Sequence, residues 1–177
     1  MTTSIAFIGL GAMGAPMLGH LLQLGCSAKA YARSDSSRAA AAELGVHLCT
    51  SPAEAARGAE FIFTNVTSTE DVRNVLCGPE GALHGAQPGA VCVDHSTISP
   101  EGAREIGQAL QAAGLHFLDA PVSGGVNGAK QASLSIMVGG DAGVFARALP
   151  LLRALGQNVR HVGPSGSGQV AKACNQL

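Results

Sequence analysis

The chain has 177 residues with 46% hydrophobic side chains, enough for one globular domain with a substantial core. Its formal net charge of −1, single Tyr and lack of Trp argue against a nucleic-acid surface, which needs positive charge and stacking groups. Five cysteines without a CxxC pair indicate reduced thiols, and six histidines without HxxxH spacing indicate no metal site.

The first 28 residues contain no charged side chain, which raises the possibility of a targeting or membrane segment. A signal peptide requires a basic start, but no basic residue precedes Lys29. A spanning helix requires about 20 apolar residues with few breaks, whereas five glycines, Pro16 and His20 interrupt this stretch. We therefore expect a cytoplasmic protein without a membrane partner.

Short apolar segments alternate with longer helical patterns along the whole chain. Strands are predicted over residues 5–8, 27–31, 61–64, 90–94, 116–119, 134–138 and 158–161. Helices are predicted over residues 12–24, 37–43, 52–57, 69–76, 100–113, 142–155 and 168–177. This alternation predicts an α/β fold with a doubly wound, mostly parallel sheet.

The first predicted strand runs into the glycine pattern GxGxxG, formed by Gly9, Gly11 and Gly14. Gly9 permits a tight turn, Gly11 lets a pyrophosphate approach the backbone, and Gly14 lets the following helix pack closely. The free N–H groups at the helix N-terminus favour phosphate. We therefore expect a dinucleotide-binding loop comprising Gly9, Leu10, Gly11, Ala12, Met13 and Gly14.

The end of the second predicted strand bears on the choice of dinucleotide. NAD sites place a carboxylate there for the ribose 2′-hydroxyl, whereas this chain has Arg33 followed by Ser34. Arg33 can pair with a 2′-phosphate, assisted by Ser34 and Arg38, which favours NADP over NAD. Asp35 lies two residues further on and weakens that preference. The alternative is that Arg33 is a solvated surface residue.

Two further motifs lie late in the chain. The sequence Ser123-Gly124-Gly125 follows a predicted strand, where consecutive N–H groups can bind an anion, although many such pairs form ordinary turns. In the last predicted helix, Gly168, Lys172 and Asn175 share one face, and Gly168 would leave room for a flat ligand. The alternative for Lys172 is a solvated helix surface.

These motifs, together with the segment from Asp94 to Pro100, make the chain resemble the β-hydroxyacid dehydrogenases over essentially its whole length. The resemblance implies a Rossmann-type NAD(P)-binding domain and hydride transfer between the cofactor and a small 3-hydroxy acid or its semialdehyde. It implies that Lys172 is the catalytic acid/base. It also implies that the substrate is held by Ser123, Gly124, Gly125 and Asn175, and that the cofactor is lined by Val66, Thr67 and Thr97.

The resemblance implies an all-helical second domain after residue 177 in members of that family, and we expect this chain to lack it. We therefore expect a dinucleotide-binding domain over residues 1–163 and a truncated interdomain helix over residues 164–177. The 177-residue form is then expected to turn over slowly or not at all, and exposed apolar positions favour a homo-oligomer. Two alternatives stay open: a non-catalytic NADP-binding module, and a reductase acting on imines or phosphorylated sugar acids.

Overall fold

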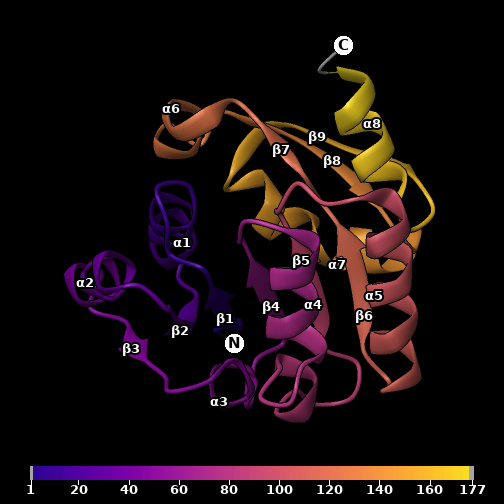
Figure 1. Ribbon diagram of the computed structural model, residues 1–177. Coiled ribbons are helices and arrows are strands. Elements are labelled where there is room, and N and C mark those ends of the chain that lie inside the picture. The colour runs from indigo at the N-terminus through magenta and orange to yellow at the C-terminus, as the bar shows by residue number, and fades with distance from the viewer. Residues whose placement is uncertain (1, 176–177) are drawn as a thin grey trace.

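The structure, a computed structural model, describes residues 2–175 and contains one mixed sheet (Figure 1). Its strands are β1 (Ser4–Ile8), β2 (Ser27–Tyr31), β3 (His47–Leu48), β4 (Phe61–Thr64), β5 (Val91–Asp94), β6 (His116–Asp119), β7 (Val122–Ser123), β8 (Leu134–Gly139) and β9 (Gly156–Gly163). The helices are α1 (Gly14–Gln23), α2 (Asp35–Glu43), α3 (Pro52–Ala56), α4 (Thr69–Cys77), α5 (Pro100–Ala112), α6 (Gly125–Lys130), α7 (Ala142–Arg153) and α8 (Ser167–Asn175), with a 3-10 helix at Ala82–His84. The predicted α/β fold is confirmed.

The order of strands places a switch point between β1 and β4. The sheet runs β3-β2-β1-β4-β5-β6-β8-β7, with β9 paired to β8. Strands β1 to β6 pair in parallel, so Ile8, Tyr31, Thr64, Asp94 and Asp119 end at one edge. In doubly wound sheets this edge, at the switch point, is where ligands bind.

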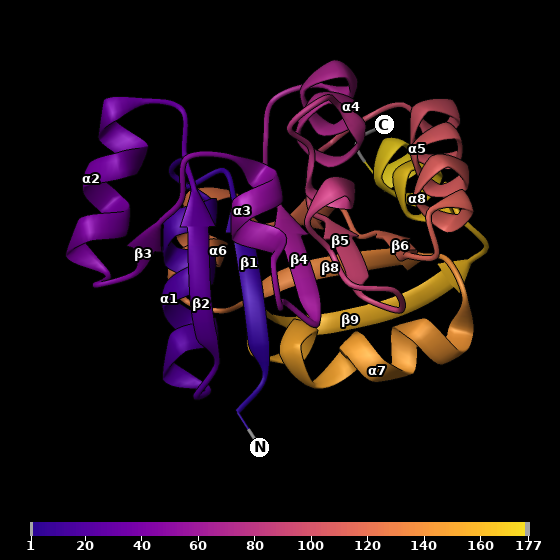
Figure 2. The same cartoon turned by 90° about the horizontal axis from the view of Figure 1, so that it is seen from below.

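Both faces of the sheet are covered, because the central strands are apolar on both sides. Strands β4 and β5 are buried throughout, as expected for parallel strands between helical layers. One core packs α1, α2, α6 and α7 against Phe7 and Phe63, and the other packs α3, α4 and α5 against Ile8 and Ile62. Figure 2 shows α4 and α5 on one side of the sheet and α7 on the other.

Four elements were not predicted from the sequence, one of them the 3-10 helix at Ala82–His84. Strands β3 and β7 have two residues each, too few to give a periodic signal. Helix α6 contains two glycines and an asparagine, which are poor helix formers. Strand β8 runs antiparallel to β6 and β7. Residues 176 and 177 of the last predicted helix lie outside the described part of the chain. No helix within residues 2–175 combines the length and apolar character needed to cross a membrane.

Candidate active site

The glycine loop after β1 has the geometry that its sequence predicts. Gly9 has a φ of +95°, and its N–H donates to the carbonyl of Tyr31 at the end of β2 at 3.0 Å, which holds the start of the loop against the neighbouring strand. A Cβ on Gly14 would collide with the carbonyl of Gly9, so close packing there requires glycine. Helix α1 begins at Gly14, so Ala12 and Met13 form the turn before it rather than its first residues.

Gly11 differs from its neighbours, because a Cβ added there would meet no protein atom within 4 Å. The fold therefore does not require glycine at this position. An exposed glycine facing open space leaves room for a group outside the protein, which is what close approach of a pyrophosphate requires. The loop fits a dinucleotide.

A cavity of about 310 Å³ lies at this edge of the sheet, over the switch point. Its walls come from the ends of β1, β2 and β4, from the first turn of α2 and from α4. Of the predicted cofactor residues, those that line it are Gly9, Leu10, Gly11, Arg33, Ser34, Val66 and Thr67. Ala12, Met13, Gly14 and Thr97 do not line it. Arg38 does not line it either, and its Nε donates to the carbonyl of Ala32 at 3.3 Å.

Lys172 and Ser123, predicted from separate motifs, meet in the structure. The Lys172 ammonium donates to the Ser123 hydroxyl at 3.0 Å, although 49 residues separate them. Lys172 is buried, with 8% of its surface exposed, and within residues 2–175 no carboxylate lies within salt-bridge distance of it. Gly124 and Gly125 follow with φ values of +132° and +59°. A buried lysine without a counter-ion, beside a glycine turn, is a candidate acid/base group.

Two other predicted residues on α8 differ in their surroundings. Asn175 lies on the same helix as Lys172 but is exposed. The expectation that Gly168 leaves room for a ligand is wrong, since it is buried and packs against the sheet. A Cβ there would lie 2.5 Å from the carbonyl oxygen of Met137 and 2.6 Å from that of Asp119. Glycine is needed for helix packing at this position.

The helix that carries Lys172 is anchored by the carboxylate of Asp119, at the end of β6. Its Oδ1 accepts the N–H of Gly166 at 2.7 Å, and its Oδ2 accepts the N–H of Gln169 at 3.0 Å. Burial raises the pKa of Asp119, while these N–H donors lower it. From the sequence, Asp119 was placed at the end of a predicted strand, ahead of the Ser123–Gly125 motif, without a role of its own, so this anchoring role was missed.

Gln169 connects α8 to the loop that follows β5. Its side chain donates to the carbonyl of Ser96 at 2.8 Å and accepts the N–H of Ile98 at 3.1 Å. The Ser96 hydroxyl in turn accepts the N–H of Val66, in the cavity wall, at 2.9 Å. A continuous set of hydrogen bonds therefore joins the cofactor cavity to the helix of Lys172. A lone glutamine gives no sequence signal for such a role.

Two buried titratable residues, Asp94 and His95, lie under this loop. Burial raises the pKa of Asp94 from 3.8 to about 6, against hydrogen bonds from Ser96 and Thr64. Burial lowers the pKa of His95 from 6.5 to about 4, and its Nδ1 lies 2.7 Å from the carbonyl of Ala120. Because this pKa lies well below physiological pH, the imidazole is neutral there, and its Nδ1 proton can be donated to the Ala120 carbonyl.

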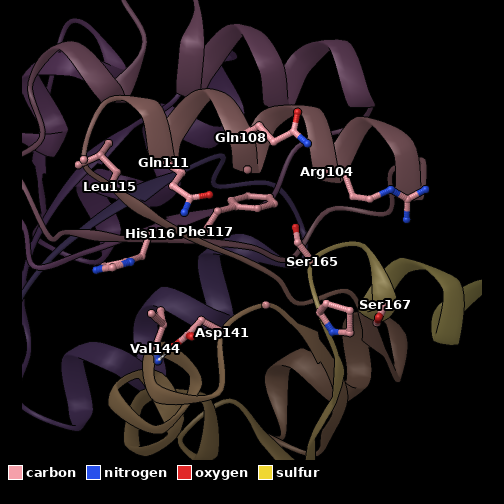
Figure 3. Close-up of a pocket in the computed structure, with 14 residues that line it drawn as sticks. Arg104, Gln108, Gln111, Leu115, His116, Phe117, Asp141, Val144, Ser165 and Ser167 are labelled. Carbon is pink, nitrogen blue, oxygen red and sulfur yellow. Dashed lines mark hydrogen bonds between the residues drawn. The ribbon is translucent and has the colours of Figure 1, made fainter.

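A second, larger hollow of about 680 Å³ lies away from these residues (Figure 3). Arg104, Gln108 and Gln111 reach it from α5, and Asp141 and Val144 from the start of α7. Its wall includes the first residues of β6 and none of the predicted site residues. The larger hollow is therefore separate from the cofactor edge.

One group of possible metal ligands is present in the described part of the chain, at the edge strand β3. The ligand atoms of His47, Cys49 and Glu54 lie within 4.8 Å of one another. Glu54 already accepts hydrogen bonds from the N–H and hydroxyl of Thr50, each at 2.7 Å. The carboxylate thus has a structural use at the start of α3.

A glycine loop at the switch point of a doubly wound sheet, opening onto a cavity between strand ends, defines a dinucleotide-binding domain. The sequence pattern described as the NAD binding domain of 6-phosphogluconate dehydrogenase matches residues 4–163. The chain belongs to this family. The predicted recognition of an N-terminal cofactor domain and the predicted NAD(P) cofactor are thereby confirmed.

The names of similar proteins are consistent with membership of this family. The 3-hydroxyisobutyrate dehydrogenase of Pseudomonas aeruginosa is 41% identical over 175 residues, which are 99% of this chain and 59% of the relative. The structure of Mycobacterium tuberculosis 3-hydroxyisobutyrate dehydrogenase with L-serine is 40% identical with a TM-score of 0.94, covering 99% of this chain and 59% of that one.

A more distant structure shares the fold alone. An imine reductase variant from Myxococcus stipitatus, in complex with NAD+, is 24% identical with a TM-score of 0.89 and covers 100% of this chain and 60% of that one. The chain spans about 60% of the length of the curated relatives it matches.

Proposed function

We propose that the chain provides the cofactor-binding part of an NAD(P)-dependent oxidoreductase that acts on a small 3-hydroxy acid or its semialdehyde. The observation that carries this proposal is the hydrogen bond between buried Lys172 and Ser123, beside the Gly124–Gly125 turn. The chain's similarity to 3-hydroxyisobutyrate dehydrogenases supports the choice of substrate class.

The dinucleotide would be held by the glycine loop and by the walls of the 310 Å³ cavity, including Val66 and Thr67. When bound, it supplies or accepts the hydride. The N–H groups of Gly124 and Gly125 and the Ser123 hydroxyl bind the substrate carboxylate, and Asn175 contacts a substrate oxygen. Lys172 takes the proton of the substrate hydroxyl in oxidation and returns it in reduction.

The experiment compares Lys172→Met with Lys130→Met, since Lys130 is an exposed lysine at the end of α6. Turnover is measured with 3-hydroxyisobutyrate and L-serine on the chain joined to the second domain of a relative, because the 177 residues alone are expected to turn over slowly or not at all. Dinucleotide affinity is measured by titration. Lys172→Met is expected to lose about 10²–10⁴ in rate with little change in affinity, because a positioned acid/base group contributes that much. Lys130→Met is expected to match the parent. Turnover of Lys172→Met within a few-fold of the parent would remove the assignment.

The same assays separate the alternative functions. Dinucleotide binding without turnover on any hydroxy acid or semialdehyde would favour a non-catalytic binding module. Turnover of imines that survives Lys172→Met would favour an imine reductase, and turnover of phosphorylated sugar acids alone would favour that substrate class. No observation in the structure favours these alternatives over the hydroxy acid.

We also propose the division of the chain into a dinucleotide-binding domain over residues 1–163 and the start of an interdomain helix over residues 164–177. Strand β9 ends at Gly163 and α8 begins at Ser167, which supports a boundary there. Val170 on α8 is 45% exposed, which supports a contact with another domain or a second copy. A cytoplasmic location, also a proposal, agrees with five free cysteines.

A further inference from the structure

Arg33 and Asp71 face each other across the cofactor cavity. Arg33 follows β2, and Asp71 lies in the first turn of α4. The guanidinium Nη1 lies 3.4 Å from Asp71 Oδ1, and both residues line the 310 Å³ cavity with Gly9 and Gly11 of the glycine loop. The carboxylate that is missing from the end of β2 is thus present on the opposite wall.

The carboxylate of Asp71 is held in place independently of Arg33. Its Oδ2 accepts the hydroxyl of Ser68 at 2.8 Å, and its backbone N–H donates to the same hydroxyl at 3.1 Å. The Arg33 side chain is 78% exposed, whereas that of Asp71 is 25% exposed. Arg33 is therefore the partner that can move, and Oδ1 of Asp71 stays at the cavity wall.

This ion pair has little to do with stability, because exposed pairs contribute little to folding. Its effect is on the charge of the cavity. Arg33 alone attracts a 2′-phosphate, since a guanidinium matches phosphate geometry. A fixed carboxylate at the same place repels that phosphate and competes for the guanidinium. A 2′-hydroxyl carries no charge and can donate to a carboxylate, so it meets no such penalty.

We propose that Asp71 is a cofactor-specificity residue that opposes Arg33 and weakens the binding of NADP(H) relative to NAD(H). The proposal rests on the proposed function only in that the cavity holds the adenosine end of the dinucleotide. The preference between the two cofactors is then set by two residues from different elements, Arg33 at the end of β2 and Asp71 on α4.

The test is a titration of NADH and NADPH against the parent and Asp71→Asn, with Glu70→Gln as the matched control. Glu70→Gln removes one negative charge at the neighbouring position. Glu70 is exposed, pairs with Arg73 and does not line the cavity. Asp71→Asn is expected to tighten NADPH binding about tenfold, equivalent to about 1.4 kcal/mol. NADH affinity is expected to change much less, and Glu70→Gln to leave both unchanged.

An Arg33→Ala background tests whether Asp71 acts through Arg33. There Asp71→Asn is expected to give a smaller gain in NADPH affinity, because only repulsion remains to be relieved. An unchanged NADPH-to-NADH ratio in Asp71→Asn, or an equal gain in Glu70→Gln, would overturn the proposal. These measurements use binding alone, so a failure to turn over hydroxy acids would remove the proposed function and leave this result standing. Loss of binding of both dinucleotides by the parent would overturn both.

Discussion

Asp119 Oδ2 accepts the backbone N–H of Gln169 at 3.0 Å, so the end of β6 holds the first turn of α8. The same carboxylate accepts the N–H of Gly166 at 2.7 Å, which satisfies a second donor at this helix start. A carboxylate at a helix N-terminus is also favoured by the helix dipole. Because Lys172 follows within one turn, the position of its ammonium depends on Asp119.

Asp119→Asn is expected to destabilise the fold by about 1.5–3 kcal/mol, the contribution of hydrogen bonds to a charged group. The amide nitrogen would face an N–H donor, so one of the two bonds is lost. Turnover should fall with the displacement of Lys172, while dinucleotide affinity changes less. Denaturant unfolding and steady-state kinetics measure both effects.

Asp141→Asn is the control for this prediction. Asp141 caps α7 by accepting the N–H of Val144 at 2.9 Å, but it is exposed and α7 carries no site residue. Asparagine caps helices about as well as aspartate, so little change is expected in stability or turnover. Equal effects of the two substitutions would contradict a special role for Asp119.

Gly11→Ala and Gly14→Ala are expected to separate binding from folding. A Cβ at Gly11 meets no protein atom within 4 Å, so stability should stay within about 0.5 kcal/mol of the parent. The methyl group would obstruct the pyrophosphate, so the affinities for NADH and NADPH should fall alike. A Cβ at Gly14 collides with the carbonyl of Gly9, so Gly14→Ala should destabilise the fold itself. Unchanged affinity in Gly11→Ala would mean that the loop is only a turn.

The main elements of the fold could be predicted because their signals are local. The apolar run of β1 followed by glycines is one such signal, and Ser99-Pro100 at the start of α5 is another, with Ser99 as the cap and Pro100 as the first helical residue. The close approach of Lys172 to Ser123 depends on the packing of α8 against β8, which no local pattern encodes. The same holds for Asp71, whose importance appears only when α4 is placed across the cavity from Arg33. Long-range pairing of this kind requires the structure.

Asp94→Asn is expected to change how stability depends on pH. The pKa of Asp94 is raised from 3.8 to about 6 in the fold, so its contribution is complete below 3.8 and is lost as pH rises through about 6. The pKa of His95 is lowered from 6.5 to about 4, so its contribution is present above 6.5 and is lost as pH falls through about 4. Between these values the two contributions oppose each other.

The substitution keeps the hydrogen bonds that Asp94 makes. Its Oδ1 accepts Thr64 Oγ1 at 2.7 Å and the Ser96 N–H at 3.1 Å, and its Oδ2 has no partner. In Asp94→Asn only the His95 contribution remains, so stability relative to the parent should increase as pH rises from about 4 to about 6. Denaturant unfolding at several pH values measures this. Parallel curves for parent and variant would show that Asp94 does not titrate as inferred.

Gln169→Met is expected to impair dinucleotide binding and turnover together, in contrast to Lys172→Met. Methionine fills a similar volume but leaves the Ile98 N–H and the Ser96 carbonyl without their partner, at about 1–3 kcal/mol for each buried group. The loop over residues 96–98 then loses both of its hydrogen bonds to α8. Because Ser96 also holds the N–H of Val66 in the cavity wall, the loss extends to the cofactor cavity.

The measurements for Gln169→Met are the dissociation constants for NADH and NADPH, kcat, and the free energy of unfolding. Gln108→Met, an exposed substitution on α5, is the control and should match the parent in all of them. Since Gln169 is buried and does not line the cofactor cavity, we expect its effect on affinity to come through the Ser96–Val66 hydrogen bond. A variant that loses turnover but binds both dinucleotides as the parent does would show that the loop over residues 96–98 is not coupled to the cavity wall at Val66. Gln169 would then act on α8 alone.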